Sequence, residues 1–409
     1  MTGAREHDLA TRLEQLLRAR GMSGSVDGLR RLSGGASRET WAFDLVAGEE
    51  RHGLILQRVR GGGSGTGPGV QGEARLMRAA EALGVPVPAV VADDDGSVLG
   101  GAGMIARRLE GETIARKLLR DDEWATARDR LVTQAGQALA AIHRIDPAVL
   151  AGARATDPVD QLRSLLDAFD QPLPAFELGI RHLEATRPPS HEPVVVHGDF
   201  RLGNLLVDHD GLAGVLDWEL AHLGDPVEDL GWYCVRAWRF GSPLPAGGMG
   251  TREALLEAYE AAGGRHVTLD QLRWWELCGT VRWGLICVMQ ARTHLDGIAR
   301  SVELATIGRR VCENEWDVLD LLPGGPLPGP QPVGAVSEAD LYGRPTAAEL
   351  LEAIREWVEG EVMGGTEGRL AFHARVAANA LRILERQAAL GPAHEAAHRA
   401  RHPPRGDED

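Results

Sequence analysis

One segment, residues 194–230, constrains the fold and chemistry of this chain more than any other. It reads VVVHGDFRLGNLLVDHDGLAGVLDWELAHLGDPVEDL. Its first three residues predict a short buried strand that leads directly into His197, Gly198 and Asp199. A carboxylate that follows a buried strand, beside a glycine, is held by a rigid scaffold and projects into a cleft. The segment therefore predicts a polar site attached to a small sheet.

The next part of the segment predicts a β-hairpin. Residues 205–208 and 212–216 look like two strands, and Asp210-Gly211 between them is a strong signal for a two-residue turn. This turn would place Asn204 directly opposite Asp217, with their Cβ atoms roughly 4.5–5.5 Å apart. An amide oxygen and a carboxylate are hard ligands that suit Mg²⁺, which shares its ligands with phosphates. We therefore expect Asn204 and Asp217 to bind the metal, which leaves Asp199 to act on a hydroxyl group.

These residues resemble the aminoglycoside phosphotransferase-like kinases, a branch of the protein-kinase-like fold that includes choline and fructosamine kinases. The resemblance runs from about residue 28 to 320 and rests on His197-Gly198-Asp199 with Asn204, Leu216-Asp217-Trp218-Glu219, Gly224-Asp225-Pro226 and Asp229-Leu230. It implies an α+β, two-lobed fold, with an antiparallel sheet and a helix in the N-terminal lobe and a mainly helical C-terminal lobe.

The resemblance also implies roles for these residues. ATP and Mg²⁺ would be the cofactors, Asp199 the catalytic base, and Asn204 and Asp217 the magnesium ligands. Asp225 and Asp229 would brace the catalytic loop through hydrogen bonds to its backbone. His143, in a helical pattern, matches a packing position of the family.

The N-terminal part supplies the expected nucleotide site. The loop Ser33, Gly34, Gly35, Ala36 and Ser37 joins two expected strands, and its glycines would let backbone N–H groups approach phosphates. By the resemblance, Glu73 pairs with a phosphate-binding cation, and the segment from Ala106 through Arg107 to Leu109 is the interlobe hinge beside adenine.

The third expected strand, LILQRV, departs from the family because it has no lysine. Gln57 and Arg58 occupy the region, and strand alternation puts them on opposite faces. Two arrangements stay open. Either a one-residue shift brings Arg58 to Glu73, which is the arrangement we expect, or the phosphates meet the Gln57 amide.

Composition narrows the function classes. The net charge is −15, which argues against a nucleic-acid partner because such proteins carry a basic surface. Lys117 is the only lysine in the sequence. The four cysteines lack metal-site spacing and are expected to be buried thiols of a reducing compartment. Because no signal peptide or long apolar stretch stands out, we expect a cytoplasmic protein without a membrane partner.

Periodicity and composition predict five parts, and the resemblance implies the functions of the first two. They are an N-terminal nucleotide-binding lobe over 1–105, a catalytic and substrate lobe over 106–322, a Pro/Gly linker over 323–336, a helical module over 337–390 and a disordered tail over 391–409. In the helical module, Thr346 and Glu349 have the spacing of a capping box.

The acceptor of the phosphate is less constrained, because fold and motif do not fix a substrate. We expect a small hydroxylated metabolite, such as a hydroxyacyl compound, because the helical half carries arginines that would repel a polycation: Arg236, Arg239, Arg273, Arg282 and Arg292. The alternatives are an aminoglycoside kinase, a kinase-fold regulatory protein that binds nucleotide with little or no turnover, or another magnesium-dependent nucleotide transferase. The sequence does not indicate an oligomeric state.

Overall fold

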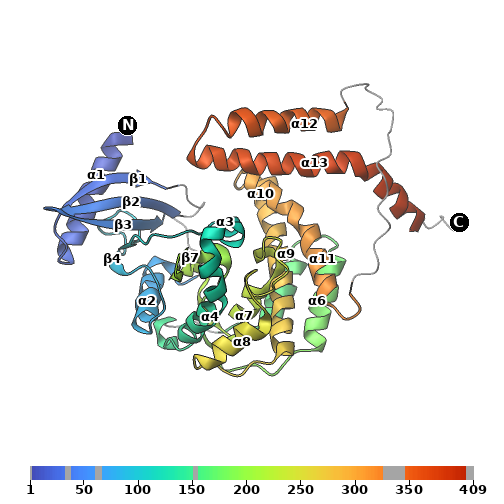
Figure 1. Cartoon of the computed structure of the whole chain (residues 1–409), viewed down its shortest axis with the longest axis horizontal. Helices are drawn as coiled ribbons and strands as arrows, with labels where there is room; N and C mark the ends of the chain where they lie inside the picture. The colour runs from blue at the N-terminus through green and yellow to red at the C-terminus, as the bar shows by residue number, and fades with distance from the viewer. Residues whose placement is uncertain (1, 33–37, 60–66, 151–154, 326–345, 402–409) are drawn as a thin grey trace. The chain divides into compact units, whose positions relative to one another are not determined.

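The computed structural model describes residues 2–32, 38–59, 67–150, 155–325 and 346–401 (Figure 1). The chain divides into two compact units, 1–282 and 283–409. We expected the division at the Pro/Gly-rich segment 323–336, but it lies inside α9 (Leu269–Leu295). The physical reason is that the helices before that segment pack with the C-terminal helices.

The first unit begins with an antiparallel sheet, as expected. Its spatial order is β1-β2-β3-β5-β4. The bounds of its strands are β1 (Ser25–Arg31), β2 (Arg38–Ala47), β3 (Glu50–Val59), β4 (Val90–Asp94) and β5 (Gly103–Arg107). The β2–β3 ladder is regular from Arg38–Val59 to Ala47–Glu50, so the turn at Gly48 sets which side chains face each other along both strands.

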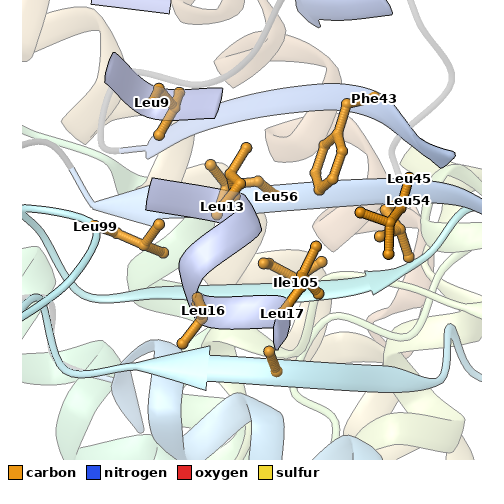
Figure 2. Packing of buried hydrophobic residues seen from close by; sticks show 11 residues of the cluster. Leu9, Leu13, Leu16, Leu17, Phe43, Leu45, Leu54, Leu56, Leu99 and Ile105 are labelled. Atoms are coloured by element: carbon orange, nitrogen blue, oxygen red, sulfur yellow. The ribbon is translucent and has the colours of Figure 1, made fainter. Parts of the chain in front are cut away.

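Helix α1 (Thr2–Ala19) packs its leucines against this sheet (Figure 2). Leu13 and Leu17 recur at helical spacing and are fully buried against Leu54, Leu56 and other strand residues. Helix α2 (Gly69–Ala82) packs against β4 and β5, and it buries Glu73 together with its apolar residues. The N-terminal lobe therefore has its own apolar core, and the carboxylate of Glu73 is buried beside it.

The remainder of the first unit is mainly helical. The bounds of its longer helices are α3 (Ala115–Arg120), α4 (Ala125–Ile142), α5 (Pro158–Asp167), α6 (Pro174–Ala185), α7 (Val227–Cys234) and α8 (Arg252–Ala261), followed by the start of α9. Two short antiparallel pairs interrupt the helices. They join β6 (Val194–Val196) to β9 (His222–Gly224), and β7 (Leu205–Asp208) to β8 (Gly211–Val215). All three valines of β6 are buried, as the sequence predicts.

The second unit is helical throughout its described residues. Its elements after α9 are α10 (Val302–Ile307), α11 (Val311–Leu321), α12 (Ala347–Trp357), the π-helical turn Val358–Val362 and α13 (Gly368–Arg401). Helices α12 and α13 lie side by side, and α10 also contacts α13 (Figure 1). The capping box of Thr346 and Glu349 is confirmed, because each side chain bonds the other residue's backbone N–H.

The C-terminal tail was predicted wrongly in part. We expected disorder from residue 391, but α13 continues to Arg401, and it contains Pro392 within its length. The residues around Pro392 are rich in alanine, which favours helix and offsets the lost hydrogen bond. Residues 402–409 lie outside the described part. Among the described residues, no helix is long and apolar enough to cross a membrane.

The packing of α1 on the sheet gives a first prediction. Leu17→Ala removes a fully buried side chain and should lower the free energy of unfolding by about 2–5 kcal/mol, since the cavity cannot close completely. Urea denaturation followed by circular dichroism measures the change. The control is Leu178→Ala, because Leu178 in α6 is 52% exposed. Equal stability of both variants would show that α1 does not contribute to the core.

Candidate active site

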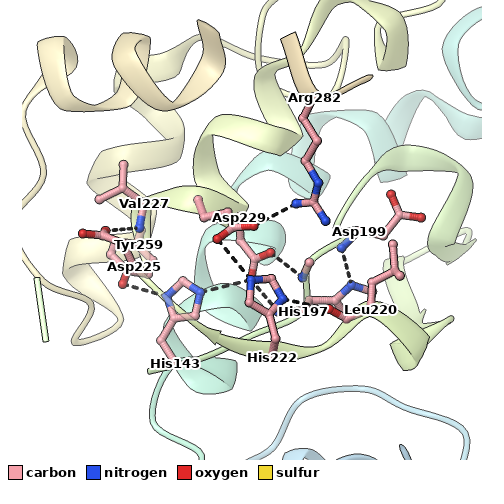
Figure 3. A network of polar contacts seen from close by, with 12 residues as sticks. His143, His197, Asp199, Leu220, His222, Asp225, Val227, Asp229, Tyr259 and Arg282 are labelled. Carbon is pink, nitrogen blue, oxygen red and sulfur yellow. Dashed lines mark hydrogen bonds and ion pairs between the residues drawn. The ribbon is translucent and has the colours of Figure 1, made fainter. Parts of the chain in front are cut away.

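The loop after β6 is held by one buried carboxylate (Figure 3). Asp229 of α7 is fully buried, and its two oxygens accept the backbone N–H groups of His197, at 2.7 Å, and of Gly198, at 2.9 Å. His143 Nε2 lies 3.2 Å from the same carboxylate, and its Nδ1 lies 2.9 Å from the Tyr259 hydroxyl. The predicted bracing role of Asp229 and the structural role of His143 are therefore confirmed.

These contacts keep the Asp229 side chain in its ionised form. Burial alone would raise the pKa of Asp229, but the hydrogen bond and charge of His143 and the backbone N–H of His197 hold it below its ordinary value. The prediction that Asp225 braces the same loop is wrong. Asp225 accepts the backbone N–H groups of His191 and Val227, which lie outside the loop, so it fixes the entry to β6 and the start of α7.

His197 adopts one defined tautomer. Its Nε2 lies 3.0 Å from the carbonyl oxygen of Leu216, which can only accept, so Nε2 carries the proton. Its Nδ1 then accepts the backbone N–H of Asp199 at 3.2 Å. Burial lowers the pKa of His197, so the ring stays neutral and keeps this pattern. A neutral imidazole thus ties the loop to the end of the neighbouring hairpin.

Gly198 is required by its surroundings. Its φ is +77°, and a Cβ atom there would lie 2.4 Å from the carbonyl oxygen of Leu220. Both the left-handed conformation and the close approach exclude a side chain. The loop that carries Asp199 is therefore pressed against the segment between Asp217 and β9.

Asp199 receives hydrogen bonds from three side chains. Trp232 Nε1 donates to Oδ1 at 2.9 Å, Asn204 Nδ2 donates to Oδ2 at 2.6 Å, and Arg201 Nε lies 3.0 Å and 3.2 Å from the two oxygens. Trp232 lies one helical turn after Asp229 on α7, so the two residues share a face. The Asp199 side chain is still 13% exposed, and it is therefore both oriented and reachable.

The hairpin forms, but its predicted register is wrong. Asp208 pairs with Gly211, so the turn lies at His209 and Asp210, one residue earlier than expected. The cause is an Asx turn, in which the Asp208 carboxylate accepts the N–H groups of Asp210 and Gly211. A register shift between Leu206 and Val207 follows. Asn204 therefore meets Leu216 across the ladder, since its carbonyl accepts the Leu216 N–H at 2.9 Å.

Asp217 follows that pair directly and has an unusual backbone. Its φ of +64° is rare for a residue other than glycine, and it begins the short helix Trp218–Leu220. Burial raises the pKa of Asp217, and the charges of Asp199 and Glu73 raise it further. Burial and the charge of Asp217 likewise raise the pKa of Glu219. Four carboxylates thus lie close enough for their charges to interact: Glu73, Asp199, Asp217 and Glu219.

This environment fits a divalent cation. Burial is the main cause of the raised pKa values of Asp217 and Glu219, and the charges of neighbouring carboxylates add to it, so a bound cation would stabilise their ionised forms. The Asn204 amide and the Asp217 carboxylate provide oxygen donors of the kind that Mg²⁺ prefers. Among the described residues, no group of three or more His, Cys, Asp and Glu side chains is placed to hold a metal ion.

The prediction that Arg58 pairs with Glu73 is wrong. Arg58 lies directly opposite Glu39 in the β2–β3 ladder and donates to that carboxylate at 2.7 Å and to the Leu99 carbonyl at 2.9 Å. Arg38, at the start of β2, instead grips Glu73 through two hydrogen bonds of 2.5 and 2.6 Å. The β2–β3 register explains why Arg58 meets Glu39, whereas the approach of α2 to the sheet brings Glu73 to Arg38.

The other expected nucleotide residues are placed as follows. Ser33, Gly34, Gly35, Ala36 and Ser37 lie outside the described residues. Ala106 and Arg107 end β5, and the chain then reaches Glu112, which exchanges two backbone hydrogen bonds with Val207. Leu109 lies between them and approaches Gly214 of β8. The segment thus connects the N-terminal sheet to the β7–β8 hairpin, as a hinge requires, while its contact with adenine stays a prediction.

The predicted acceptor arginines do not act as one group. Arg239, together with Arg252, holds the buried carboxylate of Glu276, whereas Arg236 and Arg273 are exposed and Arg292 belongs to the second unit. Arg282 donates to Glu228 at 2.8 Å and lies over the ring of Trp232. Arg201, which lies over Trp238 beside Asp199, was not among the predicted site residues.

The clamp at Asp229 gives a second prediction. Asp229→Asn removes the charge that accepts two backbone N–H groups and should lower the free energy of unfolding by about 2–4 kcal/mol at neutral pH. Its folded-state pKa is below the ordinary 3.8, so this stability is present above 3.8 and is lost as the pH falls through the lowered value. The difference between parent and variant should therefore shrink in acid.

Urea denaturation across a pH series measures this difference. The control is Asp146→Asn, because Asp146 is exposed and accepts one local N–H at 2.9 Å, which an amide oxygen can also accept. A difference between parent and Asp229→Asn that stays constant down to pH values well below 3.8 would contradict the assignment.

Solved structures with this fold include several phosphotransferases. A protein from Ralstonia eutropha JMP134 named as an aminoglycoside phosphotransferase superposes with a TM-score of 0.61 at 22% identity, covering 76% of this chain and 97% of that one. A spectinomycin phosphotransferase in complex with ADP and spectinomycin gives 0.54 at 14% identity, covering 76% and 99%. A choline/ethanolamine kinase family protein from Mesorhizobium loti gives 0.51 at 18%, covering 78% and 95%. At these identities the likenesses establish the fold.

Two regions of the sequence match other proteins or families. Over 177 residues the chain is 29% identical to the mouse protein named Acyl-CoA dehydrogenase family member 10, covering 41% of this chain and 16% of that protein. The chain thus spans about a sixth of that relative. Residues 364–409 match a family described as a domain of unknown function, which fits an appended C-terminal region. Residues 28–275, more than half of the chain, match the phosphotransferase enzyme family, and the chain belongs to that family.

Proposed function

We propose that this chain is an ATP- and magnesium-dependent kinase that transfers the γ-phosphate to a hydroxyl group of a small anionic molecule, and that a hydroxyacyl compound is its class of acceptor. The observation that carries the proposal is the immobilised Asp199, which Asn204, Trp232 and Arg201 hold at the end of a buried strand. Membership of the phosphotransferase family supports the reaction type.

Asp199 is proposed as the general base. Its carboxylate would accept the proton of the acceptor hydroxyl while the oxygen forms a bond to the γ-phosphorus. The bond from that phosphorus to the β–γ bridging oxygen breaks, and ADP leaves with the electron pair. Hydrogen bonds from Trp232 and Asn204 fix the direction of the carboxylate, so that little reorganisation is needed when the proton moves.

Asn204 and Asp217 are proposed to hold the magnesium ion. The ion would supply positive charge that orients and neutralises the phosphates. Asn204 is well placed for a double role, because its amide nitrogen already bonds Asp199 and its side-chain oxygen remains available as a ligand. The left-handed backbone at Asp217 puts a carboxylate directly after the hairpin. The base and the metal ligands would thus be connected through one side chain.

The charges beside Asp199 support an anionic acceptor. All hydrogen bonds of Arg201 in the described part of the chain leave from Nε, so its two terminal nitrogens are left for a ligand. The guanidinium of Arg201 lies over the ring of Trp238, which is buried and so holds the cation in place beside Asp199. A cation at this place suits an acyl compound with a carboxylate or phosphate and disfavours a polycationic antibiotic.

The mouse relative supports the same class of acceptor. Its name refers to acyl-CoA dehydrogenases, whose chemistry concerns acyl groups carried on coenzyme A. The matched region is about a sixth of that protein, and its name supports the acyl character of the ligand. Two proposed features, the acyl group and the negative charge, occur together in hydroxy acids and their coenzyme A thioesters.

Substitution of the base gives a third prediction. Asp199→Asn should lower the turnover number by a factor on the order of 10²–10⁴, since a general base contributes in this range, while MgATP still binds. A coupled assay of ADP release with acceptor measures turnover, and calorimetry measures binding. The control is Asp208→Asn, because the Asx turn at the hairpin tip works equally with an amide oxygen. Unchanged turnover in Asp199→Asn would exclude Asp199 as the base.

The acceptor gives a fourth prediction. In a γ-phosphate transfer assay over hydroxy acids, their coenzyme A thioesters and aminoglycosides, we expect transfer only to members of the first two groups. Arg201→Gln should raise KM for an anionic acceptor about 10-fold or more, since a charge-assisted hydrogen bond is lost. Transfer to aminoglycosides alone would reject the acceptor class. ATP binding without transfer to any compound would favour the regulatory alternative.

A further inference from the structure

The kinase site proposed above needs a cation for the nucleotide phosphates, and the usual lysine is absent. Lys117 is the only lysine in the sequence; it is half exposed and donates to Glu112 at 2.8 Å. Strand β3 offers Gln57 and Arg58 instead. Arg58 is committed to the Glu39 carboxylate and the Leu99 carbonyl, so β3 does not present a free charge at this place. The cation must come from another element.

Arg38 on β2 has the required surroundings. Two of its nitrogens grip both oxygens of Glu73, and that carboxylate is only 1% exposed, so its position is fixed by the packing of α2. The Arg38 side chain itself is 18% exposed and is therefore accessible at its outer side. The pair is built in the way a phosphate-binding cation is normally held, with a buried glutamate behind it.

Arg38 also lies near the carboxylates of Asp217 and Glu219. One of its terminal nitrogens is 3.5 Å from a carboxylate oxygen of Glu219. Asp217 lies near enough for its charge to act on the Arg38 guanidinium, and conversely. Helix α2 contacts the short helix that follows Asp217, and the Gly67 backbone touches the Glu219 carbonyl so closely that a Cβ atom would lie 2.0 Å from it. Glu73, Arg38 and Asp217 are thus held in one neighbourhood.

We infer that Arg38, from the strand next to the usual one, is the residue that binds the nucleotide phosphates in this chain, and that Glu73 positions it. The inference rests on the proposed function for the presence of a nucleotide. Arginine suits the task because its planar group can bond a carboxylate along one edge and a phosphate along another. A lysine at the same place would have to divide a single ammonium group between both.

The test compares three variants of the full chain by isothermal titration calorimetry with MgATP and with adenosine. Arg38→Gln should weaken MgATP binding roughly 10- to 100-fold, the loss of one or two charge-assisted hydrogen bonds, and leave adenosine binding unchanged. Arg38→Lys should recover part of the affinity. Arg78→Gln is the matched control, because Arg78 on α2 also forms a carboxylate pair, with Asp93 at 2.6 Å, and should bind MgATP like the parent.

Removing Arg38 leaves Glu73 buried without its partner, so the fold must be checked separately. The double variant Arg38→Gln with Glu73→Gln removes both charges, and thermal denaturation shows whether it is folded. It should retain adenosine binding and lose MgATP affinity to the same extent as Arg38→Gln. Equal loss of adenosine and MgATP would indicate a structural role and overturn the inference, as would a fully retained MgATP affinity.

Two further results separate this inference from the proposed function. If Arg58→Gln loses MgATP affinity and Arg38→Gln does not, β3 supplies the cation and the inference is wrong while the kinase proposal stands. If the parent binds MgATP through Arg38 but transfers phosphate to no acceptor, the inference holds and the proposed turnover fails. A parent that binds neither MgATP nor adenosine contradicts both.

Discussion

The geometry of the candidate active site depends on one fully buried carboxylate, that of Asp229. Both of its oxygens accept backbone N–H groups of the loop after β6, and these hydrogen bonds fix the path of the chain from the strand to Asp199. Two histidines complete the arrangement, since His143 supports the carboxylate and His197 connects the loop to Leu216. The polar groups satisfy one another inside an apolar interior, where an unpaired group would be costly.

Much of the first unit could be predicted because its signals are local. The valines of β6, the glycine-bounded strands and the leucine spacing of α1 each follow from hydrophobic periodicity, and the structure has all of them. The hairpin after Asn204 was also recognised. Its register was missed by one residue, because an aspartate at position 208 caps the turn with its side chain and outweighs the Asp-Gly signal that follows.

The remaining errors concern pairings between distant residues. Whether Arg58 or Arg38 meets Glu73 depends on which strand neighbours face each other and on how α2 approaches the sheet, and periodicity does not contain that information. The boundary between the units was missed for a similar reason. Proline and glycine mark where a chain is irregular, but the contact between α10 and α13 decides which helices pack together. The role of Arg201 became visible only with its place over Trp238.

The close contact at Gly198 has a consequence for motion. A backbone that touches the Leu220 carbonyl so tightly, next to the β6–β9 pair, cannot slide past it without breaking the ladder. We therefore expect Asp199 and the turn at Asp217 to move together. Any opening that admits or releases a ligand has to be absorbed in another segment, and residues 108–111, which are exposed or half-buried between β5 and Glu112, are suited to this. Because the backbone is held tightly at Gly198, the flexibility that ligand exchange requires falls to the segment between β5 and Glu112.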